Sequence, residues 1–183
     1  MGQIFEYKVL FDLLNSAIVA RQHIEKLSEE EFRDSALVQD AVAMRLAAMG
    51  ESISAIGDST KAHLKGIPFH KIRAVRNVIA HSYEDVNTKI IWDIAKNHLP
   101  EVIEELTNFL ALNTDFEKIT AKVHSGPPLE LLAFASQKGS ALNVILDRAI
   151  RLNIASAQEL KATLEAFYAT LKNKDGSNPE ISR

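Results

Sequence analysis

The chain has 183 residues, of which 46% are hydrophobic and 25% charged, with 7 glycines, 5 prolines, no cysteine and a formal net charge of −3. This length suffices for a folded core, and the composition argues against collagen-like repeats, extensive disorder and the basic coat of a general nucleic-acid binder. Without cysteine there are no disulfides, thiolate nucleophiles or cysteine-ligated zinc sites. Because the sequence has neither a signal-like start nor an apolar run of roughly 20 residues, we expect a cytoplasmic protein without membrane contact.

The first predicted element is a long helix over residues 4–27. Apolar residues recur there three and four positions apart, which places them on one stripe of a helix. Ser28 is followed three residues later by Glu31, a spacing typical of a capping box in which each side chain bonds the other residue's backbone N–H. A short helical turn is therefore expected to begin at Ser28.

A second long helix is predicted to start after Asp34 or Ser35, either of which can cap it. We assign its apolar stripe to Leu37, Ala41, Met44 and Ala48, continuing towards Ile56. Gly50 and Gly57 lie inside this pattern, and each costs about 1 kcal/mol relative to alanine in a helix interior. We therefore expect close helix packing or a bend at these glycines.

The third helix is predicted to begin at Pro68, after Gly66 has ended the previous segment. Its apolar stripe consists of Phe69, Ile72, Val75 and Ile79. The helix meets polar, poorly helical residues from His81 onward. Two more helices are expected over residues 88–97 and 100–112, which would complete a compact helical bundle over residues 1–112.

Residues 113–183 form a second region of the predicted organisation. A Ser-Gly-Pro-Pro sequence at 125–128 breaks any helix, and helical patterns follow over residues 129–138, 141–153 and 157–172. The last ten or so residues have the composition of a disordered end. The sequence thus predicts an all-α protein, a helical bundle followed by a C-terminal helical extension.

The charges are unevenly distributed along the chain. Residues 59–83 contain no Asp or Glu. The same window holds the basic residues Lys61, Lys65, Lys71, Arg73 and Arg76 and the histidines His63, His70 and His81. This region could attract an anion locally, although charge runs are also typical of solvated helix faces.

Arg76, Asn77, His81 and Tyr83 lie within eight residues of this window, where the third helix gives way to a loop. A guanidinium fits the oxygens of a phosphate, and an imidazole can give or take a proton at neutral pH. Asn77 lies one turn before His81 and could orient its ring. Five residues turn an ideal helix by about 140°, so Arg76 and His81 diverge unless the last turn unwinds or two copies of the segment meet across a two-fold axis.

A structural interpretation of the same residues remains open. Arg76 could form an ordinary ion pair, and His81 could be a histidine at a helix C-terminus. Glu51, in the second helix, could form a salt bridge with Arg73 or Arg76 across the bundle. The remaining histidines lack the spacing of metal ligands, so we predict no metal site and no cofactor.

The segment Arg76-Asn77-Val78-Ile79-Ala80-His81-Ser82-Tyr83 resembles the Arg-x4-His-x-Tyr motif of HepT-like toxins of the HEPN superfamily. The resemblance covers roughly residues 4–112 and includes further landmarks in the same order. These landmarks are Leu27–Phe32, Gln39–Val42, Met49–Glu51, Ile67–Ile72, Ile91–Ile94 and Leu99-Pro100. Residues 113–183 have no counterpart in such a chain, so the extension could cap the bundle, extend a dimer interface or contact a partner.

The resemblance implies an up-down bundle of four or five helices that forms a homodimer, with two motifs lining one cleft, and a metal-independent endoribonuclease acting on RNA such as tRNA or mRNA. It implies that Arg76, His81 and Asn77 are catalytic, and that Lys65, Lys71 and Arg73 contact RNA. It further implies a toxin–antitoxin pair in which the nucleotidyltransferase antitoxin MntA transfers AMP to Tyr83. The alternative is a non-catalytic subunit that binds a nucleotide or a nucleotidyltransferase partner.

Overall fold

The computed structural model describes residues 2–81, 87–124 and 139–175. These residues are helical or in short connections, which confirms the predicted all-α class. The chain divides into two compact units, residues 1–110 and 111–183, where the sequence predicts a division after residue 112. None of the helices in the described ranges combines the length and apolarity needed to cross a bilayer.

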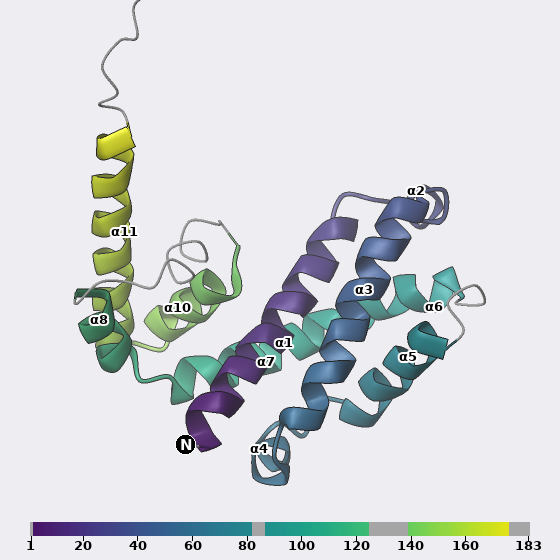
Figure 1. Ribbon diagram of the computed structural model, residues 1–183, viewed down its shortest axis with the longest axis horizontal. Coiled ribbons are helices and arrows are strands. Elements are labelled where there is room, and N and C mark those ends of the chain that lie inside the picture. Colours follow the sequence, from purple (N-terminus) through teal and green to yellow (C-terminus); the bar gives the residue numbers. More distant parts are fainter. Residues whose placement is uncertain (1, 82–86, 125–138, 176–183) are drawn as a thin grey trace, which may run out of the picture. The chain divides into compact units, whose positions relative to one another are not determined.

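The first unit is a helical bundle (Figure 1). Its elements up to residue 81 are α1 (Gly2–Ile24), α2 (Glu29–Arg33), α3 (Ala36–Ser52), the 3-10 turn η1 (Ile53–Ala55), α4 (Asp58–His63) and α5 (Phe69–His81). The predicted capping box is confirmed: Ser28 caps α2 by accepting from the Glu31 N–H, and the Glu31 carboxylate accepts from the Ser28 N–H. The Ser28 backbone N–H, as the larger cause, and the Ser28 hydroxyl both donate to the Glu31 carboxylate, and these two hydrogen bonds lower the pKa of Glu31.

Helix α3 is the centre of this unit, because α1 packs against it on one side and α5 on another. The core is made of the aliphatic side chains that these helices turn towards one another. Its buried members include Leu10, Leu13, Leu14, Ala17 and Ile24 of α1, Val42, Leu46 and Met49 of α3, and Ile72 and Ile79 of α5. The apolar stripes predicted for the first and third helices therefore face the core.

The apolar stripe assigned to the second helix does not face the core. The side chain of Leu37 is 80% exposed and that of Met44 is 66% exposed, whereas the buried face of α3 runs through Val42, Leu46 and Met49. Helix α3 is therefore apolar on two faces, so spacing within its sequence could not tell which one packs. The neighbouring helices α1 and α5, which both pack against α3, decide this.

Gly50 lies where α3 and α5 approach each other closely. A Cβ atom added there would lie 2.3 Å from the Cβ of Arg76 and 3.2 Å from the carbonyl oxygen of Ile72. The close helix packing expected at Gly50 is thus confirmed. Gly57 is different, since it does not interrupt a helix but serves as the N-cap of α4.

The bundle continues through α6 (Thr88–Asp93), a π-helical turn η3 (Ile94–His98) and α7 (Leu99–Asn113). The sequence predicts two separate helices here, but the structure joins them without a break. Pro100 lacks a backbone N–H and so leaves a carbonyl in the preceding turn without its usual helical donor, which is a recognised setting for a π turn. Trp92 packs against Phe32 of α2 with ring centroids 5.4 Å apart and ring planes tilted by 42°, which links α6 to α2.

The second unit contains α8 (Phe116–His124), α10 (Ala141–Arg151) and α11 (Ala155–Asp175). Helix α11 packs against α8 and α10. Lys161 of α11 also pairs with Asp147 of α10 at 2.6 Å. The sequence does not predict α8, whereas α10 and α11 agree closely with the helices expected over residues 141–153 and 157–172. The helix predicted over residues 129–138 and the predicted disordered end lie outside the described residues.

Replacing Gly50 with alanine tests the helix crossing. Helix propensity alone predicts that Gly50→Ala stabilises the protein by about 1 kcal/mol. The crossing predicts the opposite, because the new Cβ would overlap Arg76 and overpacking typically costs about 1–3 kcal/mol. We expect a lower free energy of unfolding in urea denaturation followed by circular dichroism.

The control is Ala74→Gly, at an exposed position of α5. Propensity alone governs this site, so a loss of about 1 kcal/mol is expected. A stabilised Gly50→Ala variant would show that the two helices do not approach as closely as described.

Candidate functional site

Helix α5 carries the residues singled out by the sequence. Arg76 and Asn77 lie in its third turn, and His81 is its last residue. The backbone of His81 is described, but its side chain is not, and Tyr83 lies outside the described residues. The structure therefore locates the arginine and asparagine side chains in full and the histidine only by its backbone position.

The guanidinium of Arg76 is held by hydrogen bonds on three of its nitrogens. Its Nε and Nη2 both donate to Oε1 of Glu51 on α3, and its Nη1 donates to Oδ1 of Asn77 at 3.1 Å. The salt bridge predicted between Glu51 and either Arg73 or Arg76 is confirmed for Arg76. The Arg76 side chain remains 33% exposed, so it is fixed in place yet open to solvent.

Gly50 and Glu51 together explain this geometry. The glycine lets the α5 backbone approach α3, and the next residue supplies the carboxylate that receives the guanidinium. A longer separation between the helices would leave the arginine stem free to adopt other rotamers. Adjacent residues on α3 thus set both the position and the orientation of Arg76.

The predicted interaction between Asn77 and His81 stays a prediction. In the structure the side-chain oxygen of Asn77 accepts from Arg76. Its amide nitrogen could still serve another acceptor. Because α5 is helical through residue 81, the positions of Arg76 and His81 differ by about 140° around its axis.

The residues proposed to contact RNA are all exposed, but they do not share one face. Lys71 and Arg73 are two positions apart on α5, which is about 200° on a helix, so they lie on opposite sides of it. Lys65 lies before α5, in the connection that follows α4. Among these residues, Arg73 lies within about 60° of Arg76 around the helix.

The acid-free window of the sequence is not acid-free in space. Glu51 reaches Arg76 from α3, and Glu105 of α7 accepts from the backbone N–H of Gly66 at 2.9 Å. The positive charge expected from residues 59–83 is therefore partly balanced by carboxylates from other helices. The positive charge that remains is local and is centred on the exposed part of the Arg76 guanidinium.

No group of three or more His, Asp or Glu side chains with metal-binding geometry occurs among the described residues. His98 and Asp93 form a pair whose Nε2 and Oδ2 are 3.3 Å apart. These residues are five positions apart, and the π turn between them brings them to one side. Two side chains alone do not define a metal site.

The family model described as "Ribonuclease HepT-like" matches residues 13–109, more than half of the chain. The chain belongs to the ribonuclease HepT-like family. This confirms the resemblance to HepT-like proteins of the HEPN superfamily. The match spans the helical bundle and includes Glu51, Arg76 and His81, while it stops before the second unit.

Several relatives carry ribonuclease names. A "putative RNase" of Methanocaldococcus jannaschii is 24% identical over 97 residues, which are 53% of this chain and 89% of that protein. A "gamma-glutamylcyclotransferase and putative RNase" of the same organism is 24% identical over 98 residues, 54% of this chain and 44% of that protein. A "putative RNase" of Caldanaerobacter subterraneus subsp. tengcongensis is 22% identical over 89 residues, 49% of this chain and 80% of that protein. No solved structure matches the chain.

The sequence alone does not reveal one feature of the HepT-like bundle, the exposure of apolar residues on α3. Leu37 and Met44 of α3 are exposed apolar residues, and Glu51 follows them on the same helix. Their spacing is visible in the sequence, but it does not show whether the stripe faces the core or the solvent. Only the packing of the helices shows that these residues are exposed.

The coupling between Glu51 and Arg76 can be measured with a double-mutant cycle of Glu51→Gln and Arg76→Gln. Both side chains are partly exposed, at 59% and 33%, so we expect a coupling free energy of about 0.5 kcal/mol and not more than about 1 kcal/mol. The measurement is urea denaturation of the four proteins at low and high NaCl. The coupling should shrink at high salt.

A control cycle uses Lys8 and Asp12, an exposed pair within α1. It should give a coupling of about 0.3–0.5 kcal/mol, typical of pairs one helical turn apart. Zero coupling between Glu51 and Arg76 at low salt would contradict the ion pair.

Proposed function

We propose that this HepT-like chain is a metal-independent endoribonuclease and the toxin of a toxin–antitoxin pair. The observation that carries the proposal is the Arg76 guanidinium, which Glu51 and Asn77 hold in place while part of it stays open to solvent. Family membership and the ribonuclease names of the relatives support the same activity. An arginine fixed before substrate arrives can stabilise charge without reorganising, which is how preorganised sites lower barriers.

The proposed reaction is transesterification within RNA. A base removes the proton from a ribose 2′-OH, the 2′ oxygen attacks the adjacent phosphorus, and the 5′ oxygen of the next nucleotide leaves with a proton from an acid. The products are a 2′,3′-cyclic phosphate and a 5′-hydroxyl end. Arg76 stabilises the negative charge of the phosphorane, His81 serves as the acid or the base, and Asn77 positions Arg76.

The site is proposed to be shared between two chains. The positions of Arg76 and His81 diverge around α5, so a single chain does not direct both side chains to one phosphate. In a homodimer, the arginine of one chain can face the histidine of its partner, and two histidines can divide the acid and base roles. The basic residues Lys65, Lys71 and Arg73 are proposed to hold the flanking phosphates of the RNA.

Regulation is proposed to act on Tyr83, two residues after His81. A nucleotidyltransferase antitoxin of the MntA type would catalyse attack of the Tyr83 phenol oxygen on the α-phosphorus of ATP, with loss of the phenol proton and release of pyrophosphate. The product carries AMP on the tyrosine. Its bulk and negative charge beside His81 would exclude an RNA phosphate by occlusion and repulsion.

Ribonuclease activity is tested by incubating the purified protein with total RNA in EDTA. We expect cleavage products that end in 2′,3′-cyclic phosphates. Arg76→Ala should reduce the rate by about 10²–10³-fold, as loss of a charge stabiliser does. His81→Ala should reduce it by about 10²–10⁴-fold, as loss of a general acid or base does.

Arg151→Ala is the matched control, an exposed arginine of the second unit, and it should cleave RNA at the wild-type rate. Arg73→Ala should weaken substrate binding and its salt dependence more than the cleavage step. Absence of cleavage together with intact nucleotide binding would instead favour the non-catalytic subunit, and cleavage that stops in EDTA would contradict metal independence.

Modification of Tyr83 is tested by intact mass spectrometry after incubation with an MntA-type nucleotidyltransferase and ATP. We expect a mass increase equal to one or more AMP units and a parallel loss of RNA cleavage. Tyr83→Phe should show neither change, because it lacks the acceptor oxygen. Tyr7→Phe is the control, and it should be modified like the wild type; an unchanged mass in the wild type would overturn the proposed regulation.

A further inference from the structure

The outer face of α5 carries a row of nitrogen-bearing residues. His70, Arg73, Asn77 and His81 follow one another at three- and four-residue intervals, and we call them the α5 polar row. On a helix that turns by about 100° per residue, these positions fall within about 80° of one another, so they lie along one side of it. The side chains of His70, Arg73 and Asn77 are exposed. The row therefore extends the candidate site along α5, away from His81.

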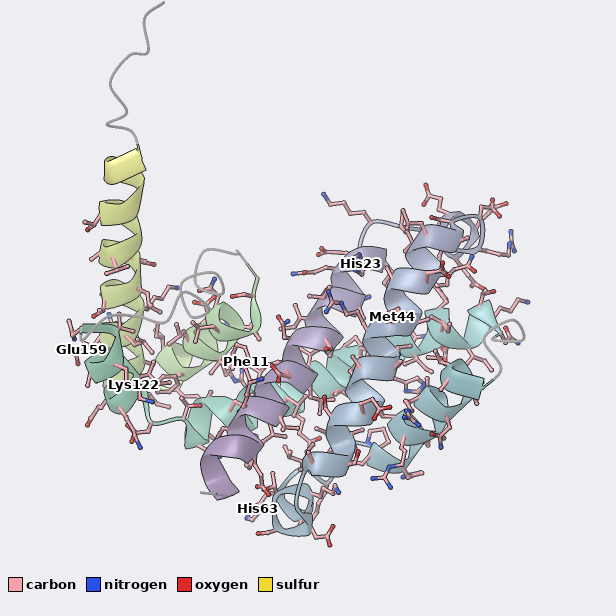
Figure 2. All side chains as sticks on the ribbon, viewed as in Figure 1. Phe11, His23, Met44, His63, Lys122 and Glu159 are labelled. Atoms are coloured by element: carbon pink, nitrogen blue, oxygen red, sulfur yellow. The ribbon has the colours of Figure 1, made fainter. Side chains whose placement is uncertain are left out.

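His70 and Arg73 are not engaged by the bundle. Neither side chain makes a hydrogen bond or an ion pair with another residue in the part of the chain that the structure describes. His63 of the same acid-free window is different, since its Nδ1 lies 2.8 Å from the carbonyl oxygen of Ser59 and its ring packs against Phe109. Figure 2 shows His63 on α4, the helix before α5. The donors of His70 and Arg73 are thus available to a ligand.

The two carboxylates that reach this segment bind elsewhere. Glu51 accepts from Arg76, which lies about 100° from Asn77 around α5. Glu105 accepts from the backbone N–H of Gly66, before α5 begins. Asn77 links the row to the candidate site, because its side-chain oxygen accepts from Nη1 of Arg76 at 3.1 Å. The row therefore combines donors without bound carboxylates and a direct connection to Arg76, which suits an anionic ligand that also enters the site.

The length of the row fits several phosphates of one nucleic-acid strand. Positions 70 and 81 lie about three turns, or about 16 Å, apart along the helix axis. One nucleotide contributes about twice as many backbone bonds as one amino-acid residue, so neighbouring phosphates of an extended strand are about 7 Å apart. A strand with its scissile phosphate at His81 therefore places another phosphate, about two nucleotides away, beside Arg73 and His70.

A single strand fits this row better than a duplex. The row is one line of donors along one helix, which matches one backbone, whereas a duplex presents two. The proposed transesterification also needs the 2′ oxygen, the phosphorus and the leaving 5′ oxygen in line, an alignment that an unpaired backbone reaches more readily than a stacked helix. Contacts to phosphates carry no base information, so the row would select strand form and length and not sequence.

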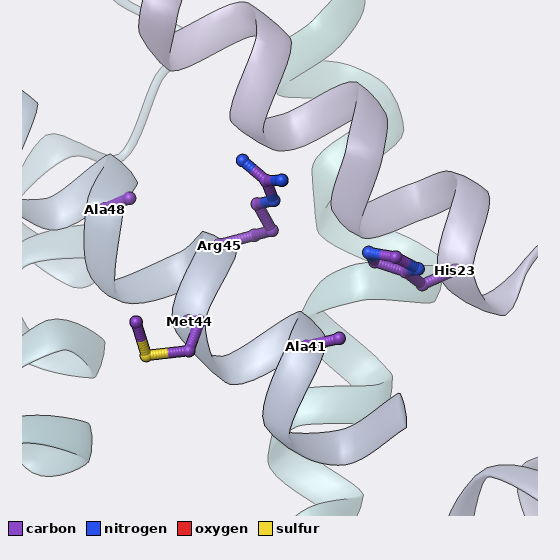
Figure 3. A pocket seen from close by; sticks show the side chains of 5 residues that line it. All are labelled: His23, Ala41, Met44, Arg45 and Ala48. Atoms are coloured by element: carbon purple, nitrogen blue, oxygen red, sulfur yellow. The ribbon is translucent and has the colours of Figure 1, made fainter. Parts of the chain in front are cut away.

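Another exposed surface with a histidine and an arginine lies on a different side of α3. His23 of α1 and Arg45 of α3 line an open hollow of about 340 Å³ together with Ala41, Met44 and Ala48. Figure 3 shows Arg45 extending towards α1, whereas α5 packs against α3 on another side. The polar groups of the hollow thus belong to the α1 side of α3, and His23 provides a matched control for His70.

We propose that single-stranded RNA runs along the outer face of α5, and that His70 and Arg73 bind the phosphates about two nucleotides from the one that is cleaved. The inference rests on the proposed function, since His81 marks the cleaved phosphate. It adds the path of the strand, its unpaired form and His70 as a binding residue.

Binding is tested by fluorescence anisotropy with a labelled, unstructured 2′-O-methyl RNA, which has no free 2′-OH and is not cleaved. His70→Ala should raise Kd by about tenfold, as loss of one hydrogen bond to a charged group does. Arg73→Ala should also weaken binding, and it should lower the slope of log Kd against log salt by about 0.7. His70→Lys should bind nearly as the wild type, because lysine again offers donors to a phosphate. His23→Ala should bind as the wild type, and circular dichroism should show an unchanged helix content in each variant.

The path is tested with DNA strands that contain a single ribonucleotide, which fixes the point of cleavage. Shortening the strand to fewer than about two phosphates on the side that lies over α5 should lower kcat/KM of the wild type by about tenfold, the effect expected for one lost charged contact. His70→Ala should lose this dependence on length, whereas His23→Ala should keep it. Pairing the strand with its complement should abolish cleavage.

Wild-type binding by His70→Ala, or an equal loss of binding in His23→Ala, would overturn the inference. Equal cleavage of long and short strands by the wild type, or equal cleavage of the paired strand, would also overturn it. The binding readout does not depend on cleavage. Binding that requires His70 in a protein that cleaves no RNA would leave the strand path in place and remove the proposed function. Cleavage that is indifferent to His70 would leave the function in place and remove the path.

Discussion

The crossing of α3 and α5 at Gly50 is the constraint on which the site depends. With no side chain at this position, the α5 backbone lies against α3, and the Cβ and Cγ of Arg76 occupy the space that a Cβ would need. The arginine therefore leaves α5 at a fixed point and meets the carboxylate of the very next residue, Glu51. A packing requirement and an electrostatic one are thus satisfied by two adjacent residues. The partial exposure of the guanidinium keeps it accessible to an anion despite these contacts.

The ion pair with Glu51 has two consequences for an anionic substrate. It fixes the rotamer of Arg76, which lowers the entropy lost when a phosphate binds. It also offsets the arginine's charge, so a phosphate has to share the guanidinium with a carboxylate. The side chains are partly exposed, which limits the strength of their attraction in water. The phosphorane of the proposed reaction bears more charge than the carboxylate or the phosphodiester, so it competes best for the remaining N–H groups.

Helix α3 is apolar on two faces, of which only one packs within the bundle. The inner face, with Val42, Leu46 and Met49, holds the bundle together, and it lies next to α1 and α5. The other face of α3, with Leu37 and Met44, is exposed and is not part of that core.

The sequence by itself determined the helical class, the capping box at Ser28, the stripes of α1 and α5 and the motif that begins at Arg76, because these depend on local spacing and side-chain chemistry. It also indicated the Glu51 salt bridge as one of two possibilities. Only the tertiary structure decided that Arg76 is the partner, that Glu51 and Glu105 reach into a window without acids of its own, and that Leu37 and Met44 face outwards. The reason is that helical periodicity defines which residues share a face, whereas the neighbour that covers this face comes from distant parts of the chain.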